Sequence, residues 1–339
     1  MIDAGGVIVG LCPDHMNLSP DQHEKLTANP YIVGRPLTRA SASLFFGRHD
    51  VFTWLEENLS CVGQPNALML YGRRRIGKTS TLYQLVEGER GRALRENPAR
   101  LIHPVYVDLQ RYAGRPTEEW LRRLVRDIYR RVESPGDSRF TFGGVNDDES
   151  AYAAFDRYLD HLEDTLPEEG HILIALDEFE QIRSGIESGS LDADVLPFLR
   201  SQIQHRHRIT FLICGALGLL DPFWNPIVNL MSRYELGMLD YEEAAALVRA
   251  PLENQMRYED EAVEMIWRQT AGHPFLIQTI CHRLVSLMNR RHQRGPIQAS
   301  DVEEILRALD KEGFVRDWLG DDLSGWNFQL PPVTLEAPR

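Results

Sequence analysis

The chain has 339 residues, of which 43% are hydrophobic and 26% charged, enough for one large globular domain and a smaller one. It carries 37 Lys and Arg residues against 50 Asp and Glu residues, a formal net charge of −13. This acidic balance disfavours a broad surface for nucleic acid or an anionic membrane. The four cysteines form no CxxC pair, which disfavours a zinc site or a disulfide framework. The longest uncharged apolar run, 209–220, is too short to span a bilayer. We therefore expect a cytoplasmic protein with no membrane partner.

Residues 1–43 are rich in Pro, Gly, Asn and Asp, which predicts an extended, irregular lead-in. Beyond them, short apolar clusters are separated by segments of helical length, the spacing of a parallel α/β sheet with buried strands. The clusters are 67–71, 103–109, 171–176, 209–214 and 234–239. We therefore expect one α/β domain over 44–240.

Two segments between the second and third clusters are predicted to be helical. Residues 117–132 carry an apolar stripe on one face, and 151–164 form the second helix. Between them, 133–150 mixes turn formers with Asp and Glu, which predicts a mobile surface loop.

After Asp240 the sequence predicts helices and no further strand. The expected helices are 241–254, 260–271, 274–292 and 301–309. Asp240 with Glu243 fits a capping box for the first of them, and Ser300 with Glu303 fits one for the last. We expect a separate helical domain over 241–325 and a tail over 326–339.

The stretch from Gly72 to Thr79 fits the pattern GxxxxGK[ST], with a predicted strand before it and a helix-compatible run after it. In such a loop the backbone N–H groups and the start of the helix face phosphates. Lys78 would reach the β- and γ-phosphates, and the Thr79 hydroxyl would bind Mg²⁺. Further nucleotide-binding candidates in this segment are Arg75, Ile76, Gly77 and Ser80. The alternative is a chance glycine-lysine turn.

A pair of carboxylates follows the third predicted strand. Asp177 and Glu178 lie at its carboxyl end, the edge where parallel sheets bind ligands. Asp177 is the candidate Mg²⁺ ligand, and Glu178 the candidate for polarising the attacking water. The alternative is a helix-capping Asp beside a solvated Glu.

Over roughly residues 29–310 the ordered motifs resemble the P-loop ATPases of the AAA+/STAND group. Besides the two motifs above, the stretches "NPYIVGRPLT", "LFFGRHDVFTWL" and "TAGHPFLIQ" are similar to the motifs with which that group surrounds ATP. The resemblance implies a three-layer P-loop domain of the ASCE type, with a five-stranded, mainly parallel sheet and a helical lid. It also implies nucleotide contacts, which would be made by Val33, Phe46, Gly47, Arg48, His273 and Pro274. The alternatives are core positions for the aromatic residues, a surface charge for Arg48 and helix capping around Gly272.

The chain also departs from this group. The place after the fourth strand reads "CGAL" (214–217), where the group often carries an arginine, and about thirty residues follow the last lid helix, too few for a winged helix. Arg233 stands just ahead of the fifth predicted strand, where an AAA+ protein can present a catalytic arginine to a neighbour; an ordinary surface arginine is the alternative. We expect Arg73, Arg74 and Arg75 to offset acidic surroundings or touch a carboxylate of the lid or of a neighbour.

The predicted function is an ATPase that binds ATP and Mg²⁺ between the two domains and hydrolyses ATP slowly as a molecular switch. The expected partners are ATP and, on activation, another protein or a second copy of the chain. One alternative is a nucleic-acid-associated AAA+ ATPase of the origin-recognition kind, disfavoured by the acidic charge. Another is a nucleotide-binding interaction module without turnover.

Overall fold

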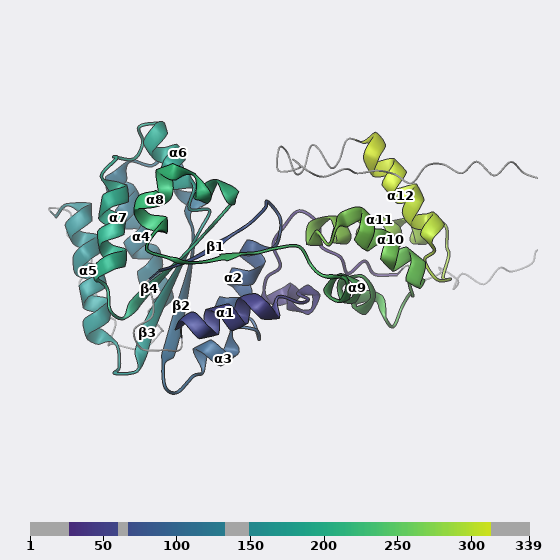
Figure 1. Ribbon diagram of the computed structural model, residues 1–339, viewed down its shortest axis with the longest axis horizontal. Helices are drawn as coiled ribbons and strands as arrows, with labels where there is room; N and C mark the ends of the chain where they lie inside the picture. Colours follow the sequence, from purple (N-terminus) through teal and green to yellow (C-terminus); the bar gives the residue numbers. More distant parts are fainter. Residues whose placement is uncertain (1–26, 60–66, 133–148, 313–339) are drawn as a thin grey trace, which may run out of the picture.

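The computed structural model describes residues 27–59, 67–132 and 149–312. These residues form an α/β domain and a helical domain that lie side by side along the long axis of the molecule (Figure 1). Nearly all of the predicted surface loop 133–150, the predicted tail 326–339 and most of the lead-in lie outside the described residues.

A five-stranded parallel sheet forms the centre of the α/β domain, with strand order β2-β3-β4-β1-β5. The strands are β1 (Ala67–Tyr71), β2 (Leu101–Asp108), β3 (Gly170–Asp177), β4 (Ile209–Gly215) and β5 (Ser232–Glu235). Because the strands run parallel, their carboxyl ends share one edge, and the register pairs Asp108 of β2 with Asp177 of β3 there. The predicted sheet is confirmed.

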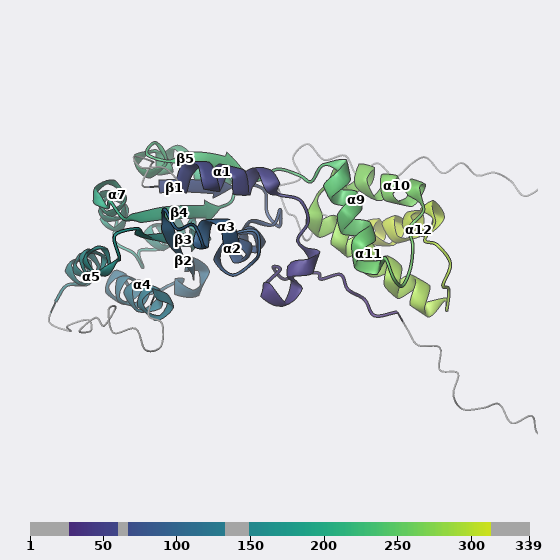
Figure 2. The same cartoon turned by 90° about the horizontal axis from the view of Figure 1, so that it is seen from below.

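Helices cover both faces of the sheet and make three layers (Figure 2). One face is covered by α4 (Thr117–Val132), α5 (Ala151–Thr165) and α7 (Val195–His205), with the short α6 (Gln181–Glu187) and α8 (Asn225–Val228) beside them. The other face is covered by α1 (His49–Leu59), α2 (Lys78–Val86) and α3 (Arg92–Arg95). Alternate residues of β3 pack on opposite faces of the sheet. Ile172 and Ile174 face the first set of helices, and Leu173 faces the second.

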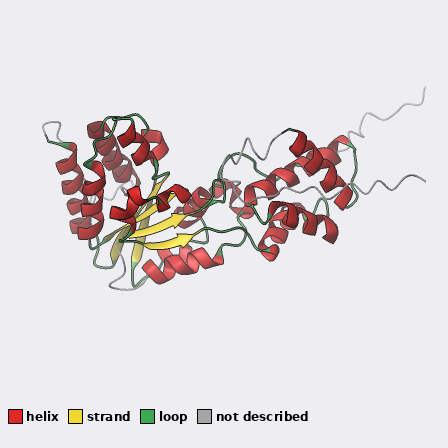
Figure 3. Cartoon of the chain, turned by 45° about the horizontal axis from the view of Figure 1, so that its top comes forward, coloured by secondary structure: helices red, strands yellow, loops and turns green. Residues whose placement is uncertain are grey.

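Within the described residues, four α-helices make up the lid, with no strand among them (Figure 3). They are α9 (Tyr241–Arg249), α10 (Asp260–Thr270), α11 (Pro274–Arg290) and α12 (Ala299–Lys311). They bury a core of their own, separate from the two cores of the sheet. The capping box at the start of α9 is present, since the Asp240 side chain accepts from the Glu243 N–H at 2.8 Å and Glu243 reaches back to the Asp240 N–H.

Some predicted boundaries are wrong, and each has a local cause. The fifth strand ends at Glu235 instead of 239, because the Leu239 N–H donates to the Gly272 carbonyl of the lid and turns the chain out of the sheet. The first lid helix ends at Arg249 instead of 254, since Pro251 has no N–H to continue it. A single bridge between Tyr258 and Ile297 also joins two lid loops.

The capping box of the last lid helix lies two residues before its predicted place. Gln298 is the N-cap, and its backbone N–H donates to Asp301 Oδ2 at 2.9 Å. The helix begins at Ala299, so Ser300 already lies within its first turn and the Ser300 with Glu303 prediction is wrong.

The described part of the lead-in, 27–38, has neither helix nor strand and runs along the lid before it reaches the α/β domain. The Thr27 N–H donates to Asn289 Oδ1 at 2.9 Å, and Tyr31, 3% exposed, is part of the lid core. The Leu37 N–H then donates to Ser80 Oγ of α2 at 2.9 Å. A 3-10 helix over Arg39–Leu44 completes the connection to α1, so the lead-in joins the two domains.

Candidate functional site

The P-loop connects β1 to α2 and depends on two left-handed backbone positions. Arg75 has φ 60° and Gly77 has φ 106°, and Gly77 is the N-cap of α2. The loop thereby curls around the start of α2, where the helix N–H groups are directed at an anion. The buried Lys78 Nζ donates to the carbonyls of Gly72 at 3.0 Å and Arg73 at 2.9 Å. The Lys78 side chain therefore joins the end of the P-loop to its beginning.

Thr79 and Asp177 meet although 98 positions separate them. Thr79 Oγ1 donates to Asp177 Oδ2 at 2.7 Å, and the Glu178 N–H donates to Asp177 Oδ1 at 3.1 Å. Within the described ranges, no group of three or more His, Cys, Asp or Glu side chains is placed to hold a metal ion by itself. One hydroxyl and one carboxylate, both hard oxygen ligands, fit Mg²⁺, which binds few protein groups together with substrate phosphates.

Glu178 has the strained backbone found at many functional positions. Its φ is 55°, in the left-handed region that a non-glycine residue rarely adopts. Its side chain lines the same cavity as Lys78 and Thr79. Burial, together with the neighbouring carboxylates of Glu180 and Asp177, raises the pKa of Glu178 above its usual value. A carboxyl group with a raised pKa is suited to accept a proton from water.

Glu180 was not predicted from the sequence, and it supplies a carboxylate where β4 ends. Its Oε1 accepts from the Ala216 N–H at 3.0 Å, while its Oε2 is buried with no hydrogen-bond partner in the described part of the chain. A Cβ atom on Gly215 would lie 2.1 Å from Oε2, so a larger residue there would displace the Glu180 side chain. Glu180 lies two residues after Glu178, at the N-cap of α6, and brings a carboxylate to the "CGAL" segment.

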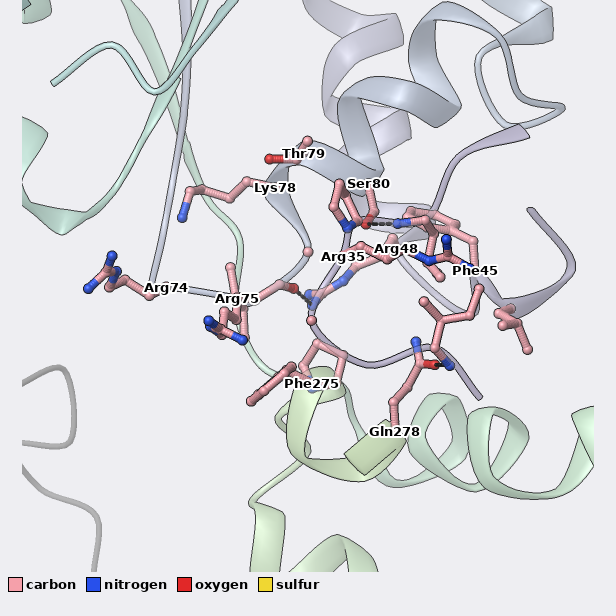
Figure 4. Close-up of a pocket in the computed structure, with 18 of the residues that line it drawn as sticks. Arg35, Phe45, Arg48, Arg74, Arg75, Lys78, Thr79, Ser80, Phe275 and Gln278 are labelled. Carbon is pink, nitrogen blue, oxygen red and sulfur yellow. Dashed lines mark hydrogen bonds between the residues drawn. The ribbon is translucent and has the colours of Figure 1, made fainter. Parts of the chain in front are cut away.

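A cavity of about 590 Å³ lies between the lead-in, the P-loop and the lid, a size typical of small-molecule sites (Figure 4). Many predicted site residues line it: Phe46, Arg48, Arg75, Ile76, Gly77, Lys78, Thr79, Ser80, Glu178 and Pro274. The others are not part of the lining: Val33, Gly47, Gly72, Asp177, His273 and Arg233. The structure thus brings the phosphate-binding candidates together with a wall of apolar side chains from the lead-in and the lid.

The wall formed by the lead-in and the lid also carries two polar side chains that were not among the predicted site residues. Arg35 of the lead-in and Gln278 of α11 line the cavity on the side away from Lys78 (Figure 4). Gln278 Oε1 accepts from the Ile32 N–H at 2.9 Å. This hydrogen bond joins the lead-in to the lid on this side of the cavity. Val33 and Phe46 pack against the lid core beside it.

Arg48 links the P-loop to the lid. Its buried guanidinium donates to the carbonyls of Ile76 at 2.9 Å and Gly237 at 2.6 Å, and its backbone N–H donates to Glu243 at 2.8 Å. The alternative of a surface charge is therefore wrong. Gly47 precedes it in the left-handed region with φ 68°, where a Cβ atom would overlap the Glu243 side chain.

The turn before α11 contacts the P-loop directly. His273 is 2% exposed, its Nε2 lies 3.3 Å from the Arg74 carbonyl, and burial lowers its pKa to about 4. The Arg75 guanidinium lies 4.5 Å from the centre of the Phe275 ring. An aromatic ring of the lid is thus one contact of Arg75, and the carboxylate contact expected from the sequence stays a prediction.

Arg233 is exposed and lies within β5, the edge strand of the sheet, one residue into the strand instead of ahead of it. Arg233 is not among the residues that line the cavity. Among the described residues, no helix has the length and apolar character needed to cross a membrane.

Comparisons with known proteins agree with this geometry. A family model described as an ATPase domain predominantly from Archaea matches residues 45–280. The ORC2 protein of Aeropyrum pernix, solved in ADPNP–ADP complexes, is similar with a TM-score of 0.52 and 15% identity, over 89% of this chain and 84% of that one. The ORC1 protein of Aeropyrum pernix, solved in complex with DNA, has a TM-score of 0.50 and 14% identity, over 83% of this chain and 69% of that one. At these identities the likeness concerns the fold alone. No curated protein matches the chain significantly in sequence.

Proposed function

The chain belongs to the family of ATPase domains found predominantly in Archaea, and on this premise we propose that it binds ATP with Mg²⁺ and hydrolyses it slowly, as a STAND-type molecular switch. The observation that carries the proposal is the convergence of Lys78, Thr79 and Glu178 at one end of the cavity, where Thr79 is hydrogen-bonded to Asp177. An apolar wall at the other end suits a nucleotide base.

Each group has a role that follows from its position. The P-loop N–H groups and Lys78 bind the phosphates, and Thr79 with Asp177 holds Mg²⁺. The metal supplies positive charge that neutralises the phosphates during transfer. Glu178 orients the attacking water and accepts its proton, for which its raised pKa suits it.

The candidate catalytic arginine, Arg233, does not line the cavity, and we expect slow turnover in a chain that lacks its contribution. Arginines that stabilise the charge of phosphoryl transfer raise rates by about 10³–10⁵-fold when a partner supplies them. We propose that Arg233, exposed on the edge strand, serves an adjacent copy of the chain in an assembly.

The decisive experiment is single-turnover ATP hydrolysis by the parent chain and by Glu178→Gln. Glutamine still accepts a hydrogen bond but cannot take a proton, so the variant is expected to bind ATP normally and to hydrolyse it about 10²–10⁴-fold more slowly. Glu187→Gln, an exposed change on α6, is the matched control and should keep the parent rate. Hydrolysis by Glu178→Gln at the parent rate would make Glu178 a bystander. A parent chain that binds ATP without forming ADP would support the non-hydrolysing module instead.

A second candidate function adds nucleic acid to the same ATPase. Its support is the likeness in fold to an ORC1 protein solved in complex with DNA. The net charge of −13 counts against a broad nucleic-acid surface. Duplex binding that weakens steeply as salt rises would favour this candidate over the switch.

A further inference from the structure

Tyr106 is the third residue from the end of β2 and contacts the predicted metal ligand from the neighbouring strand. It pairs in register with Ala175 of β3, and its hydroxyl donates to Asp177 Oδ2 at 3.2 Å. No motif pointed to it, because 71 positions separate it from Asp177.

The Tyr106 ring is held on the face of the sheet that α2 covers. It packs against the ring of Tyr83 in α2, with 4.9 Å between ring centres and an angle of 35° between planes. Since α2 begins at Lys78, the helix that follows the P-loop also fixes the ring whose hydroxyl reaches Asp177. The position of the hydroxyl is therefore set by packing.

The hydrogen bonds of Asp177 show what this hydroxyl adds. Oδ1 accepts from the Glu178 N–H, and Oδ2 accepts from both Thr79 and Tyr106. The Glu178 N–H and the Tyr106 hydroxyl come from two adjacent strands and restrain the carboxylate from two directions. Thr79 is itself assigned to the metal. The buried Cys214 thiol also hydrogen-bonds to Asp177, and among these side-chain partners Tyr106 supplies the hydroxyl that has no other assigned role.

We propose that Tyr106 is a positioning residue that holds the Asp177 carboxylate in the orientation required to bind Mg²⁺. The inference rests on the proposed function, since it assumes that Asp177 binds the metal. Partners that orient a metal ligand typically contribute 10–100-fold to metal affinity. A single bond of 3.2 Å places the expected contribution of Tyr106 near the lower end, about 10-fold.

Two phenylalanine variants separate the hydroxyl from the ring packing. Tyr106→Phe removes the donor to Asp177 and keeps the aromatic contact with Tyr83. Tyr83→Phe removes the hydroxyl of the other ring, which makes no hydrogen bond to Asp177 in the described structure, and is the matched control. Both variants keep the two rings, so the fold should be retained.

The measurement is Mn²⁺ binding, followed by electron paramagnetic resonance, with a non-hydrolysable ATP analogue on the full chain. Tyr106→Phe is expected to weaken Mn²⁺ binding about 10-fold, and Tyr83→Phe to leave it within about two-fold of the parent value. Binding of the analogue in a chelator, without metal, should be equal in all three proteins. Analogue binding that falls in Tyr106→Phe even without metal would overturn the proposed role.

Two other results would overturn the inference. Parent-like Mn²⁺ affinity in Tyr106→Phe would show that the hydroxyl does not position Asp177. Equal losses in both variants would assign the effect to ring packing. A parent chain that binds the analogue but no Mn²⁺ would overturn the Mg²⁺ assignment of the proposed function as well, so the two failures are distinguishable.

Discussion

Lys78 has a double role at the residue scale, because the same ammonium group spans the P-loop and faces the cavity. Lys78→Ala should weaken ATP binding about 10–150-fold, the loss expected when a charged hydrogen bond worth roughly 1.5–3 kcal/mol is removed. The change deletes little core packing, so folding should persist. Isothermal titration calorimetry with Mg²⁺ tests this. Lys311→Ala, at the exposed end of α12, is the control. Unchanged affinity in Lys78→Ala would contradict the assignment of the loop.

The buried side chain of His171 is expected to make the stability of the fold depend on pH. The ring is 4% exposed, its Nε2 lies 2.8 Å from Thr210 Oγ1, and burial with the nearby Arg100 and Arg208 lowers its pKa to about 3. The unfolded chain takes up a proton near pH 6.5, whereas the folded chain does not until about pH 3. Folding stability is therefore lost as the pH falls from 6.5 towards 3.

Urea unfolding at several pH values measures this contribution. His171→Gln should flatten the decline between pH 6 and 4 by up to about 1.4 kcal/mol per pH unit, the value for one proton. His205→Gln, at an exposed position on α7, should leave the slope as it is. Equal slopes in the parent and in His171→Gln would show that His171 is not the group that titrates.

At the scale of elements, the turn between α10 and α11 fits closely against the connection that leaves β5. Gly272 has φ 78°, and a Cβ atom there would lie 2.0 Å from the Leu239 carbonyl oxygen. Gly272→Ala therefore combines backbone strain with a clash against backbone, and the turn carries Pro274 and Phe275 into the cavity. We expect a loss of roughly 1–3 kcal/mol in stability together with weaker nucleotide binding.

Thermal unfolding and nucleotide titration test this prediction together. Gly295→Ala, in an open part of the lid where an added Cβ meets nothing within 4 Å, is the matched control. If Gly272→Ala behaves like Gly295→Ala in both measurements, the turn tolerates displacement and does not couple the lid to the cavity.

The sequence was sufficient to predict elements whose signals are local. The strand-loop-helix order around Lys78, the buried strand ending at Asp177 and the four lid helices each follow from periodicity, glycine placement or capping over a short window. The end of β5 and the cap at Gln298 depend on contacts with other parts of the fold. Periodicity within one segment does not report such contacts.

The phosphate-binding part of the site could be predicted from the sequence, and the rest of the site much less so. The P-loop and the Asp177–Glu178 pair have fixed spacings, so the pattern indicates them directly. Tyr106 reaches the site from the neighbouring strand β2, and only the sheet order places it there. Glu180 is two residues from Glu178, but the sequence pattern does not indicate that its side chain bonds to the Ala216 N–H after β4. Arg48 was expected at the nucleotide, but its guanidinium bonds are to two backbone carbonyls that the sequence alone does not bring together.

At the scale of the whole molecule, the lid meets the α/β domain mainly through the P-loop and the connection after β5. Arg75 lies against Phe275, His273 lies against the Arg74 carbonyl, and Leu239 bonds to Gly272. The same loop curls around the start of α2, where the phosphates are expected. Loss of a γ-phosphate would therefore act on the segment that supports the lid.

The last prediction follows from these contacts: ATP and ADP should stabilise different lid positions. A ligand shifts such an equilibrium only through its difference in affinity for the two arrangements, and ATP and ADP differ at the phosphate nearest Lys78. Hydrogen exchange over residues 241–292 should therefore differ between a non-hydrolysable ATP analogue and ADP. A ten-fold difference in exchange would correspond to about 1.4 kcal/mol. Exchange in β3 (Gly170–Asp177), at the centre of the sheet, should be the same with both ligands.

The proposed switch also requires that the isolated chain lack a catalytic arginine, which a neighbouring copy would supply. The ATPase rate per chain should rise with protein concentration, and Arg233→Ala should remove that rise without lowering the rate of dilute protein, because the exposed Arg233 would act only on a neighbour. Identical exchange with the two ligands, together with a high rate that does not depend on concentration, would contradict the switch. The protein would then be an ATPase whose lid closes the cavity but whose lid position does not depend on which nucleotide is bound. Both nucleotides would bind the same arrangement equally well.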